Sequence, residues 1–135
     1  MPLGVAKIAR EGTDVTILTY GSMTPACLEA AEESASSGGA SVEVLDLRTL
    51  VPLDVDAVLA SVRKTGRCVI VHEAPRTCGF GAELAAIVAE RALGSLLGPI
   101  ARVAGFDTPF PYTLEHVYLP DARRVSHAIA HVMAG

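Results

Sequence analysis

The sequence predicts one α/β domain built on a mainly parallel sheet, and two observations lead to this prediction. Short β-branched apolar runs alternate with segments of helical period, as in proteins whose parallel strands are joined by helices. The apolar runs are VTILTY at 15–20, SVEVLDL at 41–47 and RCVIV at 67–71. The length of 135 residues suits a single domain with a core of its own.

The N-terminal half predicts two strands, a helix and a further strand. Residues 5–10 alternate weakly and indicate a short edge strand, and the buried strand at 15–20 follows a turn. We expect Thr24 to be the N-cap of the first helix and Pro25 its first residue. Gly38-Gly39 should end this helix before the strand at 41–47.

The middle of the chain predicts a helix, the central strand and a second helix. Asp54 can cap a helix that Gly66 ends. One apolar stripe of this helix is formed by Val55, Val58, Leu59 and Val62. The run at 67–71 is the most apolar of the chain, and a helical segment extends from about Gly79 to Leu93.

The C-terminal part predicts a last strand, a loop and a last helix. The strand lies at 100–104, and the proline-containing stretch 105–120 shows no helical period, so we expect an ordered loop there. Asp121 caps the final helix. Its apolar stripe consists of Val125, Ala128, Ile129, Val132 and Met133.

Composition excludes some classes of protein and leaves one question open. A net charge of −4 without a Lys/Arg cluster argues against nucleic-acid binding, and no apolar run reaches the ~18 residues of a membrane helix. Three cysteines without a C-x-x-C pair suit a reducing cytoplasm. Apolar residues make up 50% of the chain, which indicates either an Ala/Val-rich core or a surface that another subunit covers.

The chain is organised around His72 to Glu83 (HEAPRTCGFGAE), where the most apolar strand passes through a glycine-bearing loop into a helix. Such an edge of an open α/β sheet is where ligands bind, and a helix start offers free N–H groups to an anion. The same loop can instead hold a neighbouring domain. Arg76 can fork onto the carboxylate of a partner or ligand, or remain a solvated arginine.

Several residue patterns in the chain resemble catalytic or metal-binding ones, and a structural role is favoured for each. His72 and Glu73 are adjacent on a strand, so their side chains point to opposite faces rather than forming an acid–base pair. Cys78 lies near a helix start but has no histidine beside it in the sequence. His127 and His131 have the i, i+4 spacing of metal ligands, without a third ligand.

Several stretches of the chain together resemble one family. They are EGTDVTILTYGS (11–22), VEVLDLRTLVPLD (42–54), SVRKTGR (61–67), HEAPRTCGFGAE (72–83), VAGFDTPFPY (103–112) and YLPDARRV (118–125). The chain is similar to the C-terminal domain of the transketolase-like superfamily, and most of all to the β subunit of thiamine-diphosphate-dependent 2-oxoacid dehydrogenases. The DTPFP stretch resembles the branched-chain (2-oxoisovalerate) type more than pyruvate dehydrogenase.

The resemblance implies a fold and a crevice. The expected fold is a three-layer α/β domain with a mixed, mostly parallel five-stranded sheet of order 1-3-2-4-5, in which strand 1 is antiparallel. The strands that end at Tyr20 and His72 then flank the topological switch point. The crevice between them would be lined by Gly21, Ser22, His72 and Glu73.

The resemblance also implies a division of labour within a larger enzyme. Thiamine diphosphate and magnesium belong to the parent enzyme, on its N-terminal pyrimidine-binding domain and its α subunit, so residues 1–135 are expected to form a non-catalytic assembly domain of a longer β subunit. The implied partners are the α subunit, a second β subunit and the subunit-binding domain of the acyltransferase. The alternatives are the same domain of a pyruvate or acetoin dehydrogenase, a free-standing module for a small anion, and a cysteine- or histidine-based enzyme.

Two expectations concern the loop itself. Relatives commonly carry glycine where this chain has Cys78, so a left-handed backbone there would be strained. Glycines on both sides of Phe80 should hold the loop close to its sheet and leave the ring little room to fold inward. We therefore expect Phe80 to contact the rest of the parent enzyme.

Overall fold

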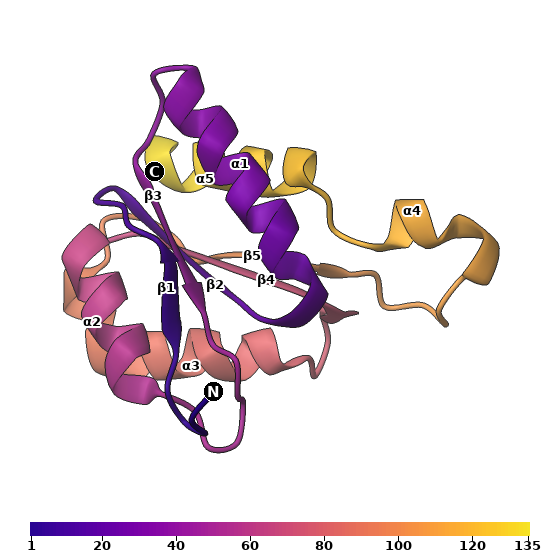
Figure 1. The fold of residues 1–135 in the computed structure, drawn as a ribbon, viewed down its shortest axis with the longest axis horizontal. Coiled ribbons are helices and arrows are strands. Elements are labelled where there is room, and N and C mark those ends of the chain that lie inside the picture. The colour runs from indigo at the N-terminus through magenta and orange to yellow at the C-terminus, as the bar shows by residue number, and fades with distance from the viewer.

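The computed structural model describes residues 1–135 as one sheet covered by helices on both faces (Figure 1). The sheet has the order β1-β3-β2-β4-β5, and only the pairing of β1 with β3 is antiparallel, as expected. The strands are β1 Lys7–Arg10, β2 Val15–Thr19, β3 Val42–Asp46, β4 Cys68–Pro75 and β5 Ala101–Gly105. The helices are α1 Thr24–Ser36, α2 Val55–Thr65, α3 Phe80–Ala92, α4 Glu115–Tyr118 and α5 Ala122–Ala134, with 3-10 turns η1 Gly21–Met23, η2 Leu93–Ser95 and η3 Tyr112–Leu114.

The sheet separates two apolar cores. Helices α1 and α5 cover one face, and α2 and α3 cover the other (Figure 1). Successive side chains of β4 point to opposite faces of the sheet and so contribute to both cores. Val69 and Val71 lie on the α1/α5 side, and Cys68 and Ile70 lie on the α2/α3 side. None of the helices combines the length and the apolar character needed to cross a membrane.

The helix signals predicted from local sequence are mostly confirmed. The Asp54 carboxylate accepts a hydrogen bond from the Ala57 N–H at 3.1 Å, and Asp121 accepts one from Arg124 N–H at 2.9 Å. Gly38 and Gly66 take left-handed conformations directly after their helices, with φ of 72° and 77°. These positions need no partner outside their own turn, which is why sequence alone could identify them.

Three local expectations are wrong. The N-cap of α1 is Met23, because η1 leads directly into the helix, and the Thr24 hydroxyl is buried without a partner. The stretch 105–120 is not helix-free, since it contains η3 and the short α4. Met133 lies on the exposed side of α5, outside the buried stripe.

A polar network joins the sheet to α2 inside the second core. The Glu43 carboxylate is almost fully buried and accepts hydrogen bonds from Lys64 Nζ and from Ser61 Oγ, the latter at 2.5 Å. Thr16 Oγ1 lies 2.8 Å from the hydroxyl oxygens of both Ser61 and Thr65. Burial pushes the pKa of Glu43 up, but the bonds from Lys64 and Ser61 hold it below its usual value.

Candidate functional site

The topological switch point lies between β2 and β4, as expected. The chain leaves β2 for α1 on one face of the sheet and leaves β4 for α3 on the other. At the carboxyl ends of these strands, Ser22 Oγ donates a hydrogen bond to Glu73 Oε2 at 2.9 Å. Gly21, with φ of 64°, turns the chain so that Ser22 reaches Glu73. Ser22 and Glu73 of the predicted crevice are therefore brought into contact.

The crevice is acidic, which bears on what it can bind. Glu73 is exposed at its edge, and the Ser22 hydroxyl donates to Glu73 rather than facing a ligand. Burial is the main cause that raises the pKa of the Tyr20 hydroxyl, and the negative charge of Glu73 raises it further, so the phenol stays neutral. A small anion would meet a carboxylate at this place, so the geometry opposes a switch-point anion site.

His72 faces away from the crevice, into the α2/α3 side of the sheet. Its side chain is 1% exposed, and Nδ1 lies 3.0 Å from the Ala74 carbonyl, to which it can donate. Burial lowers the pKa of His72, which favours the neutral ring. The ring lies directly under the backbone of Gly79 and Gly81, at which an added β-carbon would come within 2.8 Å and 2.6 Å of it. His72 thus has the geometry of a structural residue that supports the loop.

The loop is fastened to β5 and to the segment that follows it. Arg76 donates from its backbone N–H to the Gly105 carbonyl at 3.1 Å and from its guanidinium to the Arg102 carbonyl at 3.0 Å. Thr77 N–H donates to Asp107 Oδ1 at 2.9 Å, and the Thr77 hydroxyl bonds the other carboxylate oxygen. These bonds, the hydroxyl bond first, lower the pKa of Asp107. The loop is held by its own domain.

Cys78 and Phe80 occupy different environments in this loop. Cys78 is exposed and has φ of 60°, so the left-handed backbone considered for this position is present and carries the strain of a β-carbon. Phe80 is half-buried against the α2/α3 core, and its ring meets Tyr20 edge-on with a centroid separation of 6.4 Å. The expectation that this ring cannot fold inward is wrong, because the close approach of Gly79 and Gly81 to the sheet places Phe80 over Tyr20. Its role as a contact to the parent enzyme stays a prediction.

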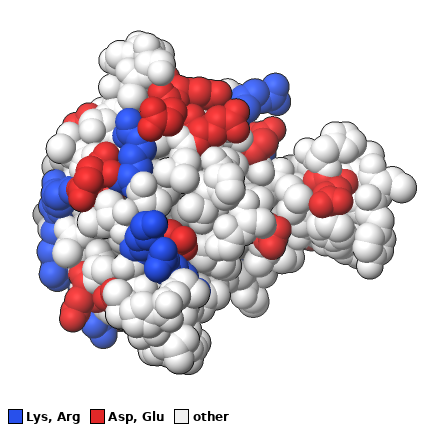
Figure 2. Space-filling view, in the orientation of Figure 1, with Lys and Arg blue, Asp and Glu red and all other residues white.

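Several exposed large apolar side chains lie elsewhere, on the connection between β5 and α5. We call residues 106–119 the projecting arm, because this segment extends away from the sheet and its helices (Figure 1). Its exposed large apolar side chains are Phe106, Phe110, Tyr112, Leu114 and Val117, and Tyr112 is 87% exposed. Inside the arm, Phe110 packs edge-on against Tyr118 with a centroid separation of 5.1 Å. The arm is largely uncharged on the face in view (Figure 2).

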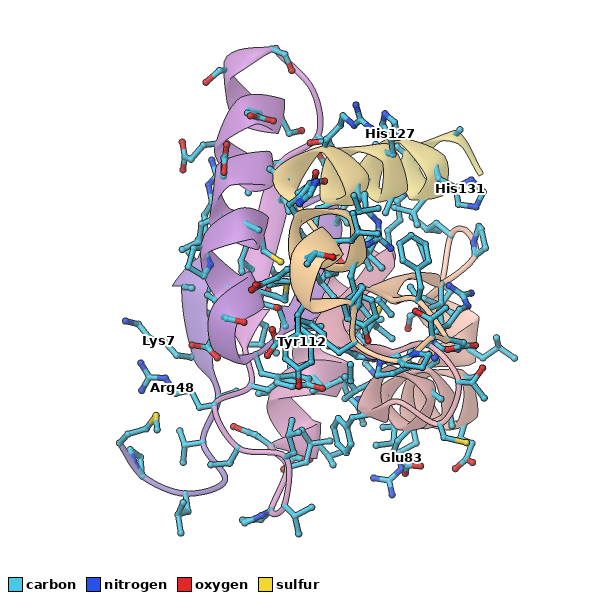
Figure 3. All side chains as sticks on the ribbon, turned by 90° about the vertical axis from the view of Figure 1, so that its right-hand side faces the viewer. Lys7, Arg48, Glu83, Tyr112, His127 and His131 are labelled. Carbon is cyan, nitrogen blue, oxygen red and sulfur yellow. The ribbon has the colours of Figure 1, made fainter.

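Residues that resemble nucleophiles or metal ligands do not assemble into a site. Burial raises the pKa of Cys27 and of Cys68 to about 12, so neither thiol ionises at neutral pH. His127 and His131 point outward from α5 (Figure 3), and no three His, Cys, Asp or Glu side chains gather closely enough to hold a metal ion.

Sequence reasoning missed two arginines that the fold brings to Arg76. Arg102 on β5 and Arg124 in the first turn of α5 line the same small hollow as Arg76. The signal was weak, because Arg76 and Arg102 are 26 positions apart and only the pairing of β4 with β5 joins them. The projecting arm was missed for another reason: the stretch was recognised as a motif, but its exposure depends on the tertiary structure.

A three-layer α/β domain with this strand order has the architecture of the transketolase C-terminal domain. A family model described as "Transketolase, C-terminal domain" matches residues 4–125. The chain belongs to the transketolase C-terminal domain family.

Curated relatives narrow the comparison to 2-oxoacid dehydrogenases. The chain is 50% identical over 133 residues to "2-oxoisovalerate dehydrogenase subunit beta" of Pseudomonas aeruginosa, which covers 98% of this chain and 37% of that protein. It is also 50% identical over 135 residues to "Pyruvate dehydrogenase E1 component subunit beta" of Leifsonia xyli, covering 99% of this chain and 40% of that protein. The chain thus spans well under half the length of these relatives. Identity does not separate the branched-chain type from the pyruvate type.

Solved structures agree with the fold. A chain described as "Split gene transketolase, inactive beta4 tetramer" superposes with a TM-score of 0.86 and 30% identity, covering 99% of this chain and 43% of that one. A 2-oxoglutarate:ferredoxin oxidoreductase from Magnetococcus marinus has a TM-score of 0.54 at 18% identity, over 93% of this chain and 19% of that one, a likeness of fold alone.

Proposed function

We propose that this chain is the C-terminal assembly domain of the β subunit in the decarboxylating component of a 2-oxoacid dehydrogenase complex. The high identity to two kinds of β subunit, over almost the whole chain, supports this assignment. Because the chain spans well under half of those relatives, the proposal includes a longer subunit with an N-terminal pyrimidine-binding domain.

The observation that carries the assembly role is the projecting arm. Monomeric proteins seldom expose several large apolar side chains on one extension, and aromatic residues are enriched at protein interfaces. Tyr112, labelled in Figure 3, is 87% exposed, so its ring is free to enter a partner. We assign the arm to contact with a second β subunit. The description of a structural relative as a β4 tetramer supports self-association of chains with this domain.

The further partners of the proposal are the α subunit and the subunit-binding domain of the acyltransferase. Their contacts require surfaces beyond the arm, and the resemblance to 2-oxoacid dehydrogenases is what supports them. The loop around Phe80 is the second candidate surface. Because Phe80 is half-buried on its own core, its replacement is expected to destabilise the isolated domain as well as the assembly.

The proposal places the cofactor outside this chain. Thiamine diphosphate with magnesium needs carboxylate or amide ligands for the metal and donors for the phosphates. The switch-point crevice instead presents Glu73, bonded to Ser22, and no cluster of metal-binding side chains lies near it. We expect thiamine diphosphate and magnesium to give no heat above dilution when titrated into the chain. Binding tighter than about 1 mM would count against the assembly role, since measurable affinity at that level means a real site.

The substrate of the proposed parent enzyme is a branched-chain 2-oxoacid. The DTPFP stretch, Asp107 to Pro111, favours this over pyruvate, so the proposed role is in branched-chain amino acid catabolism. The proposed location is the cytoplasm, which three cysteines without a C-x-x-C pair favour. Pyruvate and acetoin dehydrogenases are the alternatives, since the pyruvate-type relative is equally similar. Decarboxylation rates of the complete enzyme with 3-methyl-2-oxobutanoate and with pyruvate decide between them.

Sedimentation equilibrium tests the assembly role. At tens of micromolar, the chain should form dimers or larger species, and Tyr112→Ser should weaken association by about 30-fold, as expected for an aromatic anchor worth ~2 kcal/mol. Val51→Ser is the matched control, because Val51 is 91% exposed but lies outside the arm. A monomer that also fails to bind a hydrophobic dye, or equal effects of the two substitutions, would contradict the proposal.

A further inference from the structure

Three arginine side chains from three separate elements line one hollow of about 160 Å³. Arg76 comes from the loop after β4, Arg102 from β5 and Arg124 from the start of α5. The remaining wall consists of Ala104, Gly105 and Phe106, and the guanidinium of Arg124 lies 5.0 Å from the centre of the Phe106 ring. No carboxylate forms a salt bridge with any of the three arginines.

The hydrogen bonds of these arginines leave donors unused. Arg76 and Arg102 each donate to the backbone carbonyl of the other, and Arg124 donates to the Ala104 carbonyl at 2.7 Å. Each bond uses one of the five N–H donors that a guanidinium carries. Arg102 Nε is buried and has no partner at all. A buried donor of a charged group is rarely left unpaired in a folded protein.

The charges around the hollow are also unbalanced. Asp107 and Asp121 are the carboxylates near enough to act on these arginines, but Asp107 is bonded to Thr77 and Asp121 caps α5. Burial is the main cause that lowers the pKa of Arg102, and the positive charge of Arg76 lowers it further. Three positive groups thus lie near two carboxylates, neither of which forms a salt bridge with them, in a protein with a net charge of −4.

We propose that this hollow binds a small oxyanion, a phosphate or carboxylate group of a free ligand, between Arg76, Arg102 and Arg124. A guanidinium group can form two parallel hydrogen bonds with such an anion, and the bound ligand would neutralise the excess positive charge of the hollow. A volume of about 160 Å³ admits one anionic group and excludes a folded peptide segment. The site does not depend on the assembly role, because it lies within one chain.

The bound anion would also connect the arm to the sheet. Arg124 holds the Ala104 carbonyl of β5 and approaches the Tyr118 carbonyl at 3.5 Å, close to the end of the arm, while Phe106 begins the arm. An anion bound by Arg124 and Arg102 would therefore link both ends of the arm to the edge strand β5. Ligand binding is expected to raise the thermal stability of the chain, since it favours the folded state.

Nuclear magnetic resonance of the arginine Nε–H groups tests the site directly. The 135-residue chain is titrated with inorganic phosphate and, separately, with acetate, at constant ionic strength set with sodium chloride. The Arg102 Nε–H resonance, assigned by its loss in Arg102→Lys, should shift and saturate. Arg76→Gln should weaken binding by about tenfold, the usual effect of removing one charge-assisted partner. Arg91→Gln, an exposed arginine on α3, should leave it unchanged.

Thermal melts provide the second measurement and show that each variant is folded. Phosphate should raise the melting temperature of the wild type and of Arg91→Gln equally, and that of Arg76→Gln much less at the same concentration. Saturation by phosphate alone would define a phosphate site, and saturation by acetate as well would define a general oxyanion site. Failure of both anions to saturate the Arg102 resonance would leave a carboxylate of a partner chain as the occupant and overturn the proposal. Equal effects of the Arg76 and Arg91 substitutions would overturn it too.

Discussion

Replacing Gly81 with alanine tests whether His72 supports the central loop. A β-carbon at Gly81 would lie 2.6 Å from His72 Nε2 and 3.1 Å from Ile70 Cγ2. The imidazole cannot move aside easily, because the side chain is buried and its Nδ1 is bonded to the Ala74 carbonyl. The new methyl group must therefore displace either the ring or the start of α3.

The expected change in stability follows from three contributions. Overpacking a filled site costs typically 1–3 kcal/mol, so about 2 kcal/mol is reasonable for this contact. Loss of the hydrogen bond between His72 and Ala74 adds about 1 kcal/mol if the ring rotates. Alanine favours the helix more than glycine does, which offsets about 0.5 kcal/mol of this cost near the helix start. Gly81→Ala should lower the free energy of unfolding by roughly 2.5 kcal/mol if the ring rotates and by roughly 1.5 kcal/mol if it does not.

Urea unfolding of matched variants measures this effect. Gly94→Ala is the control, because a β-carbon there meets no atom within 4 Å. The double variant His72→Ser with Gly81→Ala should lose less than the sum of the single changes, since the smaller side chain makes room for the methyl group. If Gly81→Ala proves as stable as Gly94→Ala, or if the double variant is strictly additive, His72 does not support the loop in the way described.

Three further predictions concern strain and ionisation. Cys78→Gly should raise the free energy of unfolding by about 0.5 kcal/mol, because relief of the left-handed strain at φ 60° exceeds the entropy that glycine gains in the unfolded chain; an unchanged urea midpoint would contradict this. Glu43→Gln should lose about 2 kcal/mol at pH 7, less than for a fully buried pair because Lys64 is half-exposed. Since the pKa of Glu43 is lowered in the folded protein, this difference in stability should be fully present above the unfolded pKa of about 4.3. It should disappear as the pH falls through the folded pKa, and a stability difference that persists at pH 2 would exclude an ionic origin. As the pH falls below ~6.5, the melting temperature of the wild type should drop further than that of His72→Gln, because His72 takes up a proton more readily in the unfolded chain than in the folded one. Equal drops in the two melting temperatures would exclude the lowered pKa.

Local sequence was sufficient for most of the elements. The caps at Asp54 and Asp121 and the end of α2 at Gly66 act within one turn, so their residues identify them without knowledge of the fold. Thr24 shows the limit of such reasoning. Thr24 does not cap the helix, because the preceding 3-10 turn continues directly into α1. The strand order was expected from the resemblance, because hydrogen-bonded pairing between distant strands leaves little trace in local patterns.

The sequence by itself determined where the five strands and helices α1, α2, α3 and α5 form, to within a few residues, and it carried the resemblance to the family. Only the tertiary structure decided which polar groups meet. Ser22 reaches Glu73 across 51 positions, Lys64 reaches Glu43 across 21, and Arg76 reaches Arg102 across 26. Caps, turns and apolar periodicity depend on residues a few positions apart, whereas burial, ion pairing and exposure depend on which strands become neighbours, and that is settled by packing the two cores against one sheet.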